Sequence, residues 1–158
     1  MKKQQGGFTL IELIMVIVIL GILAAVALPR IGSLAADARA ASINGALGSA
    51  KSSLAIVRAL ASAKGLTGDE AKLELEDEKI NLINGYPATV DDLLVAAGLE
   101  SDFVASGTSI YQRGNNTSYP NCTFTYSVPV AAASGNAATA GAIKTANKKN
   151  APLTADDC

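Results

Sequence analysis

Glu12 is the residue of this 158-residue chain whose surroundings point most directly to chemistry. It is the only charged residue between Phe8 and Leu28, in the run FTLIELIMVIVILGILAAVAL. A carboxylate inside an apolar segment of this length costs roughly 2.5–3.5 kcal/mol on insertion scales and usually has a functional partner. The alternative is a side chain that snorkels to the lipid headgroups, because Glu12 lies near one end of the run.

Cleavage just before the apolar run would create a partner for Glu12. The small pair Gly6-Gly7 precedes Phe8, so a cut after Gly7 frees an α-amine on Phe8 and leaves the run on the mature protein. An ammonium group on Phe8 of a neighbouring chain is then the expected partner of the Glu12 carboxylate. A secretory signal peptide has only about 7–15 apolar residues, with its cleavage site behind them. We therefore predict that the run is retained as an anchor.

The two cysteines, Cys122 and Cys158, are the other candidates for distinctive chemistry. The chain has no His, which excludes His-dependent catalysis, and two cysteines alone are too few for a zinc site. Their separation does not resemble CxxC, so a disulfide is favoured over a redox-active pair, and loop entropy makes it worth about 4 kcal/mol. Residues 69–79, DEAKLELEDEK, lack the spacing of a calcium loop. We expect no catalytic residue, no metal and no cofactor.

The motif GFTLIE at residues 7–12, with the apolar run behind it, closely resembles the type III signal of type IV pilins and pseudopilins. The resemblance implies that a prepilin peptidase cuts between Gly7 and Phe8 and methylates the new Phe8 amine. It implies a subunit anchored in the inner membrane, with its head in the periplasm. Inner-membrane assembly machinery then builds a homopolymeric extracellular filament, in which Glu12 faces the Phe8 amine of an adjacent subunit.

Gly21 and Pro29 match the positions between which pilin helices tend to melt in assembled filaments. The residues themselves allow two interpretations. Pro29 removes one helical hydrogen bond at a cost of about 3 kcal/mol, and Gly21 costs about 1 kcal/mol relative to Ala. The stretch Ile22–Leu28 between them could therefore extend or melt, or Pro29 could simply kink the helix.

The elements that position these residues begin with a long helix. At about 1.5 Å per residue, Phe8–Leu28 spans roughly 31 Å, about one bilayer core, and Lys2 and Lys3 ahead of it favour a cytoplasmic N-terminus. The helical pattern continues to about Lys64-Gly65, so the helix is too long to fit inside a small domain and its first half must protrude. Six apolar residues form one stripe on its second half: Ile43, Leu47, Ala50, Leu54, Val57 and Ala61.

The rest of the chain predicts a small α+β head with the pilin fold. Two strands are expected, at Ser109–Arg113 and Cys122–Val130, and Ile80–Ile83 is a candidate for a further short strand before the Asn84-Gly85 turn. The strand at Cys122–Val130 alternates, with Cys122, Phe124, Tyr126, Val128 and Val130 facing inward and Thr123, Thr125 and Ser127 facing outward. A short helix is expected at Val90–Ala97, between a Thr89 cap and a Gly98 stop. The segment NGYPAT is similar to part of mannose-sensitive haemagglutinin-type pilins, and a disulfide-bounded C-terminal loop is typical of type IV pilins.

The predicted organisation is a leader at 1–7, an apolar membrane and assembly helix at 8–30, and a head at 31–158. Within the head we expect an amphipathic helix at 31–64, a connecting loop with the short helix at 65–101, antiparallel strands at 102–130 and a surface loop at 131–158.

Composition argues against an ordinary metabolic enzyme, and the resemblance to pilins points to a structural subunit. The chain is 49% hydrophobic and 17% charged, with a net charge of −1, so it offers no basic surface for nucleic acid. We predict a type IV pilin. The alternatives are a pseudopilin of a type II secretion system, a minor pilin, and a membrane-anchored binding module that never polymerises. An enzyme would need a nucleophile and base pair that the sequence does not show.

Overall fold

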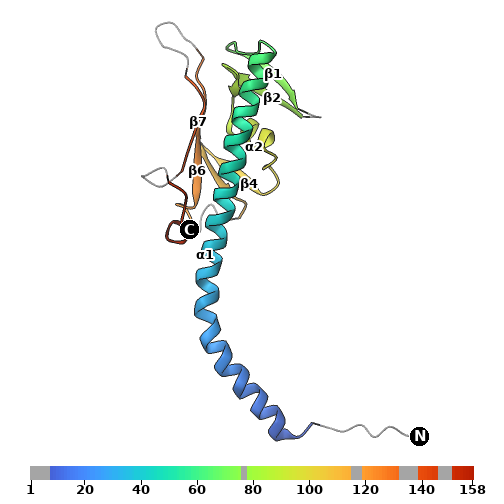
Figure 1. The fold of residues 1–158 in the computed structure, drawn as a ribbon, viewed down its shortest axis with the longest axis vertical. Coiled ribbons are helices and arrows are strands. Elements are labelled where there is room, and N and C mark those ends of the chain that lie inside the picture. The colour runs from blue at the N-terminus through green and yellow to red at the C-terminus, as the bar shows by residue number, and fades with distance from the viewer. Residues whose placement is uncertain (1–7, 76–77, 115–118, 132–138, 146–150) are drawn as a thin grey trace, which may run out of the picture.

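Helix α1 (Leu10–Ala63) forms the axis of the molecule. The computed structural model describes residues 8–75, 78–114, 119–131, 139–145 and 151–158. The helix has 54 residues and begins two residues later than predicted, because Thr9 takes an extended N-cap conformation. It ends as predicted, at the Lys64 cap followed by Gly65 with a positive φ of 71°. Its first half protrudes alone, and the head packs only against its second half (Figure 1).

Helix α1 is continuous across Gly21 and Pro29 in the single subunit. Figure 1 shows a smooth curvature of its protruding half rather than a break. The stretch Ile22–Leu28 is therefore helical here, and its melting on assembly stays a prediction.

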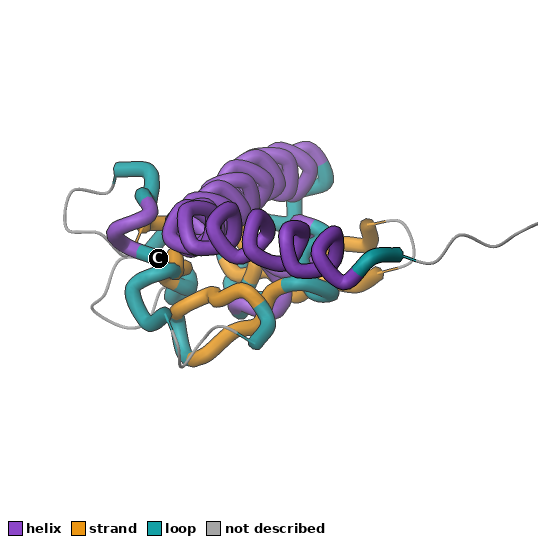
Figure 2. The backbone as a smooth tube through the Cα atoms, turned by 90° about the horizontal axis from the view of Figure 1, so that it is seen from below, coloured by secondary structure: helices purple, strands orange, loops and turns teal. Residues whose placement is uncertain are grey.

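Two antiparallel sheets and helix α2 (Val90–Ala97) make up the head, and both sheets lie on one side of α1 (Figure 2). The first sheet has the order β1-β2-β3 and the second the order β4-β5-β6-β7. The strands are β1 (Ala71–Leu75), β2 (Glu78–Ile83), β3 (Tyr86–Pro87), β4 (Phe103–Ser106), β5 (Ser109–Gln112), β6 (Thr123–Ser127) and β7 (Ala142–Thr145). The short 3-10 helix η1 (Ala155–Asp157) follows β7. The α+β class and the antiparallel pairing are as predicted.

The stripe on the second half of α1 packs against both sheets. All six predicted residues are buried except Leu54, which is partly buried. Its upstream part joins α2 and the second sheet in one core, which contains Leu93, Phe124 and Tyr126. Val57 and Ala61 join the first sheet in a separate, smaller core. The stripe therefore fixes the head to the helix at two places.

Helix α2 follows the predicted signals. The Thr89 hydroxyl accepts from the backbone N–H of Asp92, and the Asp92 carboxylate accepts in return from the backbone N–H and hydroxyl of Thr89. Gly98 takes the left-handed cap conformation, with a φ of 64°. The Thr89 hydroxyl and the Asp92 carboxylate thus each satisfy a backbone N–H at the start of the helix, where these groups have no partner within the helix.

The prediction of a connecting loop at 65–101 is wrong for residues 71–75 and for the start of β2. These residues form a hairpin in which Leu73 pairs with Ile80 and Ala71 with Leu82. Leu73, Ile80 and Leu82 are buried, whereas Lys72 and Glu74 face solvent. The many acidic residues of this segment concealed the alternation of apolar and charged side chains at every second position, which is the pattern of a half-buried strand.

The predicted strand Cys122–Val130 is too long, and β4, which lies within the predicted strand region 102–130, was not predicted as a separate strand. Because β6 ends at Ser127, Val128 and Val130 are exposed rather than inward-facing. Thr123, expected to face outward, is only 4% exposed, and its hydroxyl donates to the carbonyl of Ile110. A buried hydroxyl is tolerated when it is hydrogen-bonded, and this partner on β5 satisfies it.

The prediction of a surface loop at 131–158 is also wrong in part. Strand β7 pairs with β6 and so extends the second sheet, with Ile143 opposite Tyr126. Further on, Leu153 is buried in the main core. Backbone pairing, which needs no bulky side chains, keeps this Ala-rich segment on the sheet.

Candidate assembly site

Phe8, Thr9 and Glu12 lie together at the free end of α1. Glu12 Oε2 accepts from the backbone N–H of Thr9 at 2.9 Å and from the Thr9 hydroxyl at 2.7 Å. The Glu12 N–H is directed back to the Thr9 hydroxyl oxygen at 3.4 Å. Thr9 and Glu12 therefore form a capping box, which folds the carboxylate toward the start of the helix, beside Phe8. Gly7, the other predicted processing residue, lies outside the described residues.

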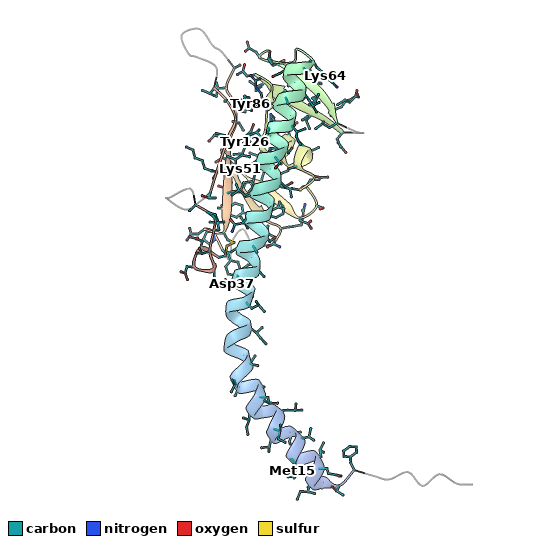
Figure 3. All side chains as sticks on the ribbon, viewed as in Figure 1. Met15, Asp37, Lys51, Lys64, Tyr86 and Tyr126 are labelled. Atoms are coloured by element: carbon teal, nitrogen blue, oxygen red, sulfur yellow. A yellow bond between two sulfur atoms is a disulfide. The ribbon has the colours of Figure 1, made fainter. Side chains whose placement is uncertain are left out.

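The helix surface that follows these residues is apolar on every side. Each described side chain from Phe8 to Leu28 is exposed, and Figure 3 shows side chains projecting from several sides of this half of the helix, which extends away from the head. One helix of the described chain, Leu10–Leu28, is long and apolar enough to cross a membrane by length and composition. Exposed apolar surface of this extent is far larger than a soluble monomer carries, so a lipid or protein partner is required.

The predicted site residues fall into two groups. Phe8 and Glu12 are brought together at one end of α1, and Gly21 and Pro29 follow along the same protruding half. Cys122 and Cys158 lie in the head, where they form a disulfide with an S–S distance of 2.04 Å. The disulfide therefore belongs to the construction of the head, away from the assembly end.

The polar contacts around the disulfide were missed by the sequence analysis. Arg39 of α1 donates two hydrogen bonds to the carbonyl oxygen of Cys158 and stacks on the Tyr119 ring at 3.9 Å. Asn44 exchanges two hydrogen bonds with the backbone of Leu153, at 2.8 and 2.9 Å. Together these contacts fasten the C-terminal segment to α1. No sequence motif indicates them, because the hydrogen-bond partners are more than 100 positions apart and Tyr119 is 80 positions from Arg39.

Thr9 was also missed as a site residue, although a signal for it exists. The spacing Thr-x-x-Glu at residues 9–12, just ahead of an apolar run, is the sequence signature of a capping box.

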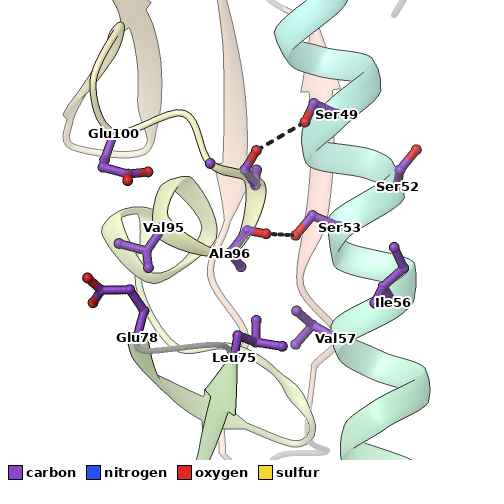
Figure 4. Close-up of a pocket in the computed structure, with 12 residues that line it drawn as sticks. Ser49, Ser52, Ser53, Ile56, Val57, Leu75, Glu78, Val95, Ala96 and Glu100 are labelled. Carbon is purple, nitrogen blue, oxygen red and sulfur yellow. Dashed lines mark hydrogen bonds between the residues drawn. The ribbon is translucent and has the colours of Figure 1, made fainter.

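A cleft of about 600 Å³ lies between α1, the end of α2 and the facing ends of β1 and β2. Ser49 and Ser53 on its wall donate to the carbonyls of Ala97 and Ala96, at 3.2 and 2.7 Å (Figure 4). These hydroxyls hold α2 against α1, which is a structural role. The described residues contain no group of three His, Cys, Asp or Glu side chains arranged to hold a metal.

Among the described residues of the head, Tyr126 is the titratable group with the most strongly perturbed pKa. Its hydroxyl donates to the carbonyl of Pro87 at 2.7 Å and so links the two sheets. Burial, with a smaller contribution from the negative charge of Asp92, raises the pKa of the Tyr126 phenol well above its usual value. A neutral, hydrogen-bonded phenol in this place serves packing.

Comparison with known protein families decides the nature of the apolar end. A family model described as the prokaryotic N-terminal methylation motif matches residues 2–28. The chain carries this methylation signal. The methylation motif is the processing signal of type IV pilins and of type II secretion proteins. The matched residues include Phe8, Glu12 and the apolar segment at the start of α1. Together with this apolar segment, the motif indicates a subunit that is anchored in a membrane before assembly. No solved structure matches the chain.

Proposed function

We propose that the chain is a type IV pilin, a structural subunit that polymerises into a filament on the bacterial surface. Prepilin peptidase cuts between Gly7 and Phe8 and methylates the Phe8 amine. The subunit waits in the inner membrane with its head in the periplasm, and inner-membrane machinery then adds it to the filament. Glu12 pairs with the Phe8 amine of an adjacent subunit, and the helix melts locally between Gly21 and Pro29 as it packs.

The observation that supports this proposal is the combination of the methylation motif with an apolar half-helix that no part of the head covers. The same surface fits two environments in turn, because lipid tails and the apolar helices of other copies are equally free of water. A subunit can thus leave the membrane for a filament core without exposing the surface to water.

The second candidate is a pseudopilin of a type II secretion system or a minor pilin, since the methylation motif is shared. Two features bear on this choice. The C-terminal segment is closed by the Cys122–Cys158 disulfide, whereas pseudopilins more often stabilise this region with calcium. The retained Glu12 favours a regular body subunit over a tip initiator, but it does not separate the pilin from minor pilins, which can also keep it.

Electron microscopy of sheared cell-surface material, with mass spectrometry of the N-terminus, tests the proposal. We expect long fibres whose subunits begin at a methylated Phe8. Short periplasmic assemblies, with no surface fibres, would indicate the pseudopilin. Subunits that stay single in the membrane would point to the anchored binding module and overturn both assignments.

Glu12→Val tests the charge pair. The variant should insert in the membrane normally, because it removes the only charge from the apolar span, but it should not form fibres. Glu70→Val is the matched control, since Glu70 is an exposed carboxylate of the head and this variant should assemble normally. Normal fibres from cells that produce only Glu12→Val would exclude the pairing role.

A further inference from the structure

We propose that Thr9 is a positioning residue for filament assembly, whose hydroxyl holds the Glu12 carboxylate in place for the amine of a second copy. This inference rests on the proposed function and adds a residue to its pairing site. Thr9 itself need not touch the neighbouring subunit. Its effect passes through the Glu12 side chain.

The geometry divides the Glu12 carboxylate into a used and an unused oxygen. Both acceptor contacts, from the Thr9 N–H and the Thr9 hydroxyl, are made to Oε2. In the described part of the chain, no residue besides Thr9 bonds to this carboxylate. Oε1 has no partner among the described residues and so keeps its acceptor capacity for an ammonium group, because a carboxylate can accept several hydrogen bonds at once.

The place of this carboxylate matters as much as its free oxygen. A Glu side chain has three rotatable bonds, and fixing such a side chain costs up to about 2 kcal/mol of conformational entropy. Because of the two contacts to Thr9, the Glu12 side chain is already ordered in the single subunit, before the subunits come together. These contacts also hold the carboxylate at the first turn of the helix, close to Phe8. Two parallel α1 helices therefore need to be shifted only slightly along their axes for the Glu12 carboxylate of one to meet the Phe8 amine of the other.

Thr9 also caps the helix, and this second role must be separated from the first. Its hydroxyl oxygen faces the Glu12 N–H, one of the unpaired donors of the first turn. A capping role needs only an acceptor at position 9. Holding the carboxylate needs a donor there, and Thr and Ser hydroxyls supply both.

Three substitutions distinguish the roles. Thr9→Val has nearly the same shape and removes the hydroxyl. Thr9→Ser keeps donor and acceptor. Thr9→Asp is at least as good an N-cap as Thr, but an ionised Asp cannot donate to Glu12 and repels it. The measured quantity is the ratio of subunits in sheared fibres to Phe8-processed subunits in the membrane, with processing read by mass spectrometry.

We expect Thr9→Val to lower this ratio about tenfold, since it removes a hydrogen bond to a charged group. Thr9→Ser should restore it, and Thr9→Asp should leave it low. The unfolding of the head should be unchanged in all three variants, because Thr9 contacts no residue of the head.

Several outcomes would overturn the inference. A normal ratio for Thr9→Val would show that Glu12 needs no positioning, and a normal ratio for Thr9→Asp would reduce Thr9 to a cap. Failure of Thr9→Val to be cut after Gly7 would place the hydroxyl in processing and not in assembly. Normal assembly of Glu12→Val is a different result, because it would remove the proposed charge pair itself.

Discussion

The two halves of α1 are one continuous helix with opposite surroundings. In the first half, Ile19 is 56% exposed, although it lies in the most hydrophobic part of the chain. In the second half, Ile43 is completely buried, yet the helix around it is rich in small and polar residues. Within the subunit, the more hydrophobic half of α1 is therefore the less buried half. The apolar side chains of the first half are left for a partner outside the chain, whereas those of the second half pack against the head.

The two capping boxes repeat this contrast on a smaller scale. In the head, the Asp92 carboxylate accepts from Thr89 and also from the backbone and side chain of Asn81, so both of its oxygens have partners. At the free end of α1, Glu12 makes contacts with Thr9 alone among the described residues. Both carboxylate oxygens are thus bonded in the capping box of the head, whereas one oxygen at the free end has no partner among the described residues; in the proposed filament, the Phe8 amine of a second subunit supplies that partner.

The largest expected effect comes from opening the disulfide, and it should be confined to the head. The Cys122→Ala, Cys158→Ala double variant should lose about 4 kcal/mol of unfolding free energy, because its unfolded head gains the entropy of a loop whose ends lie 36 positions apart. Thermal unfolding of the full chain in detergent would measure the loss. Membrane insertion should stay normal.

Reductant provides the control for this prediction. It should destabilise the native chain to a similar extent and leave the double variant unchanged. An unchanged unfolding free energy in the double variant would mean that the Arg39 and Asn44 contacts hold the C-terminal segment without the disulfide.

The next prediction compares the effect of an Ile→Ala substitution in each half of α1. Ile43→Ala should cost about 3 kcal/mol of head stability, because it leaves a cavity where the helix meets the core. Ile19→Ala should change head stability by less than about 0.5 kcal/mol, as exposed substitutions usually do. Denaturant unfolding in detergent measures both. Equal losses in the two variants would show that the protruding half packs on the head.

Local and periodic signals were sufficient to predict much of this fold. The stripe on α1 repeats at the helical period, and Thr89 and Gly98 are strong signals for the ends of α2, so these elements were predicted correctly. The GFTLIE motif likewise placed Phe8 and Glu12 at one end of a helix.

Most of the errors have a different origin, namely contacts between distant parts of the chain, and only the error in β1 is local. Strand β7 is held by pairing with β6, and Thr123 is buried because Ile110 supplies a carbonyl for its hydroxyl. The contacts of Arg39 and Asn44 with the C-terminal segment leave no trace in their own neighbourhoods. In β1 the pattern was present, but the charged residues on its exposed face obscured it.

The smallest expected effect is a loss of head stability at alkaline pH, caused by Tyr126. Burial raises the pKa of its phenol, so the folded head keeps the proton at pH values where the unfolded chain, with an ordinary pKa of 10.0, releases it. The stabilisation is therefore complete below about pH 10 and decreases as pH rises above that value, by up to about 1.4 kcal/mol per pH unit. The free energy of unfolding, measured by denaturant titration in detergent at a series of pH values between about 8 and 11, gives the size of this loss. Tyr126→Phe loses the hydrogen bond to Pro87 and should start about 1 kcal/mol less stable, but its decline above pH 10 should be shallower. The same decline in both proteins would show that another group of the head, and not the link between its two sheets, sets the alkaline limit.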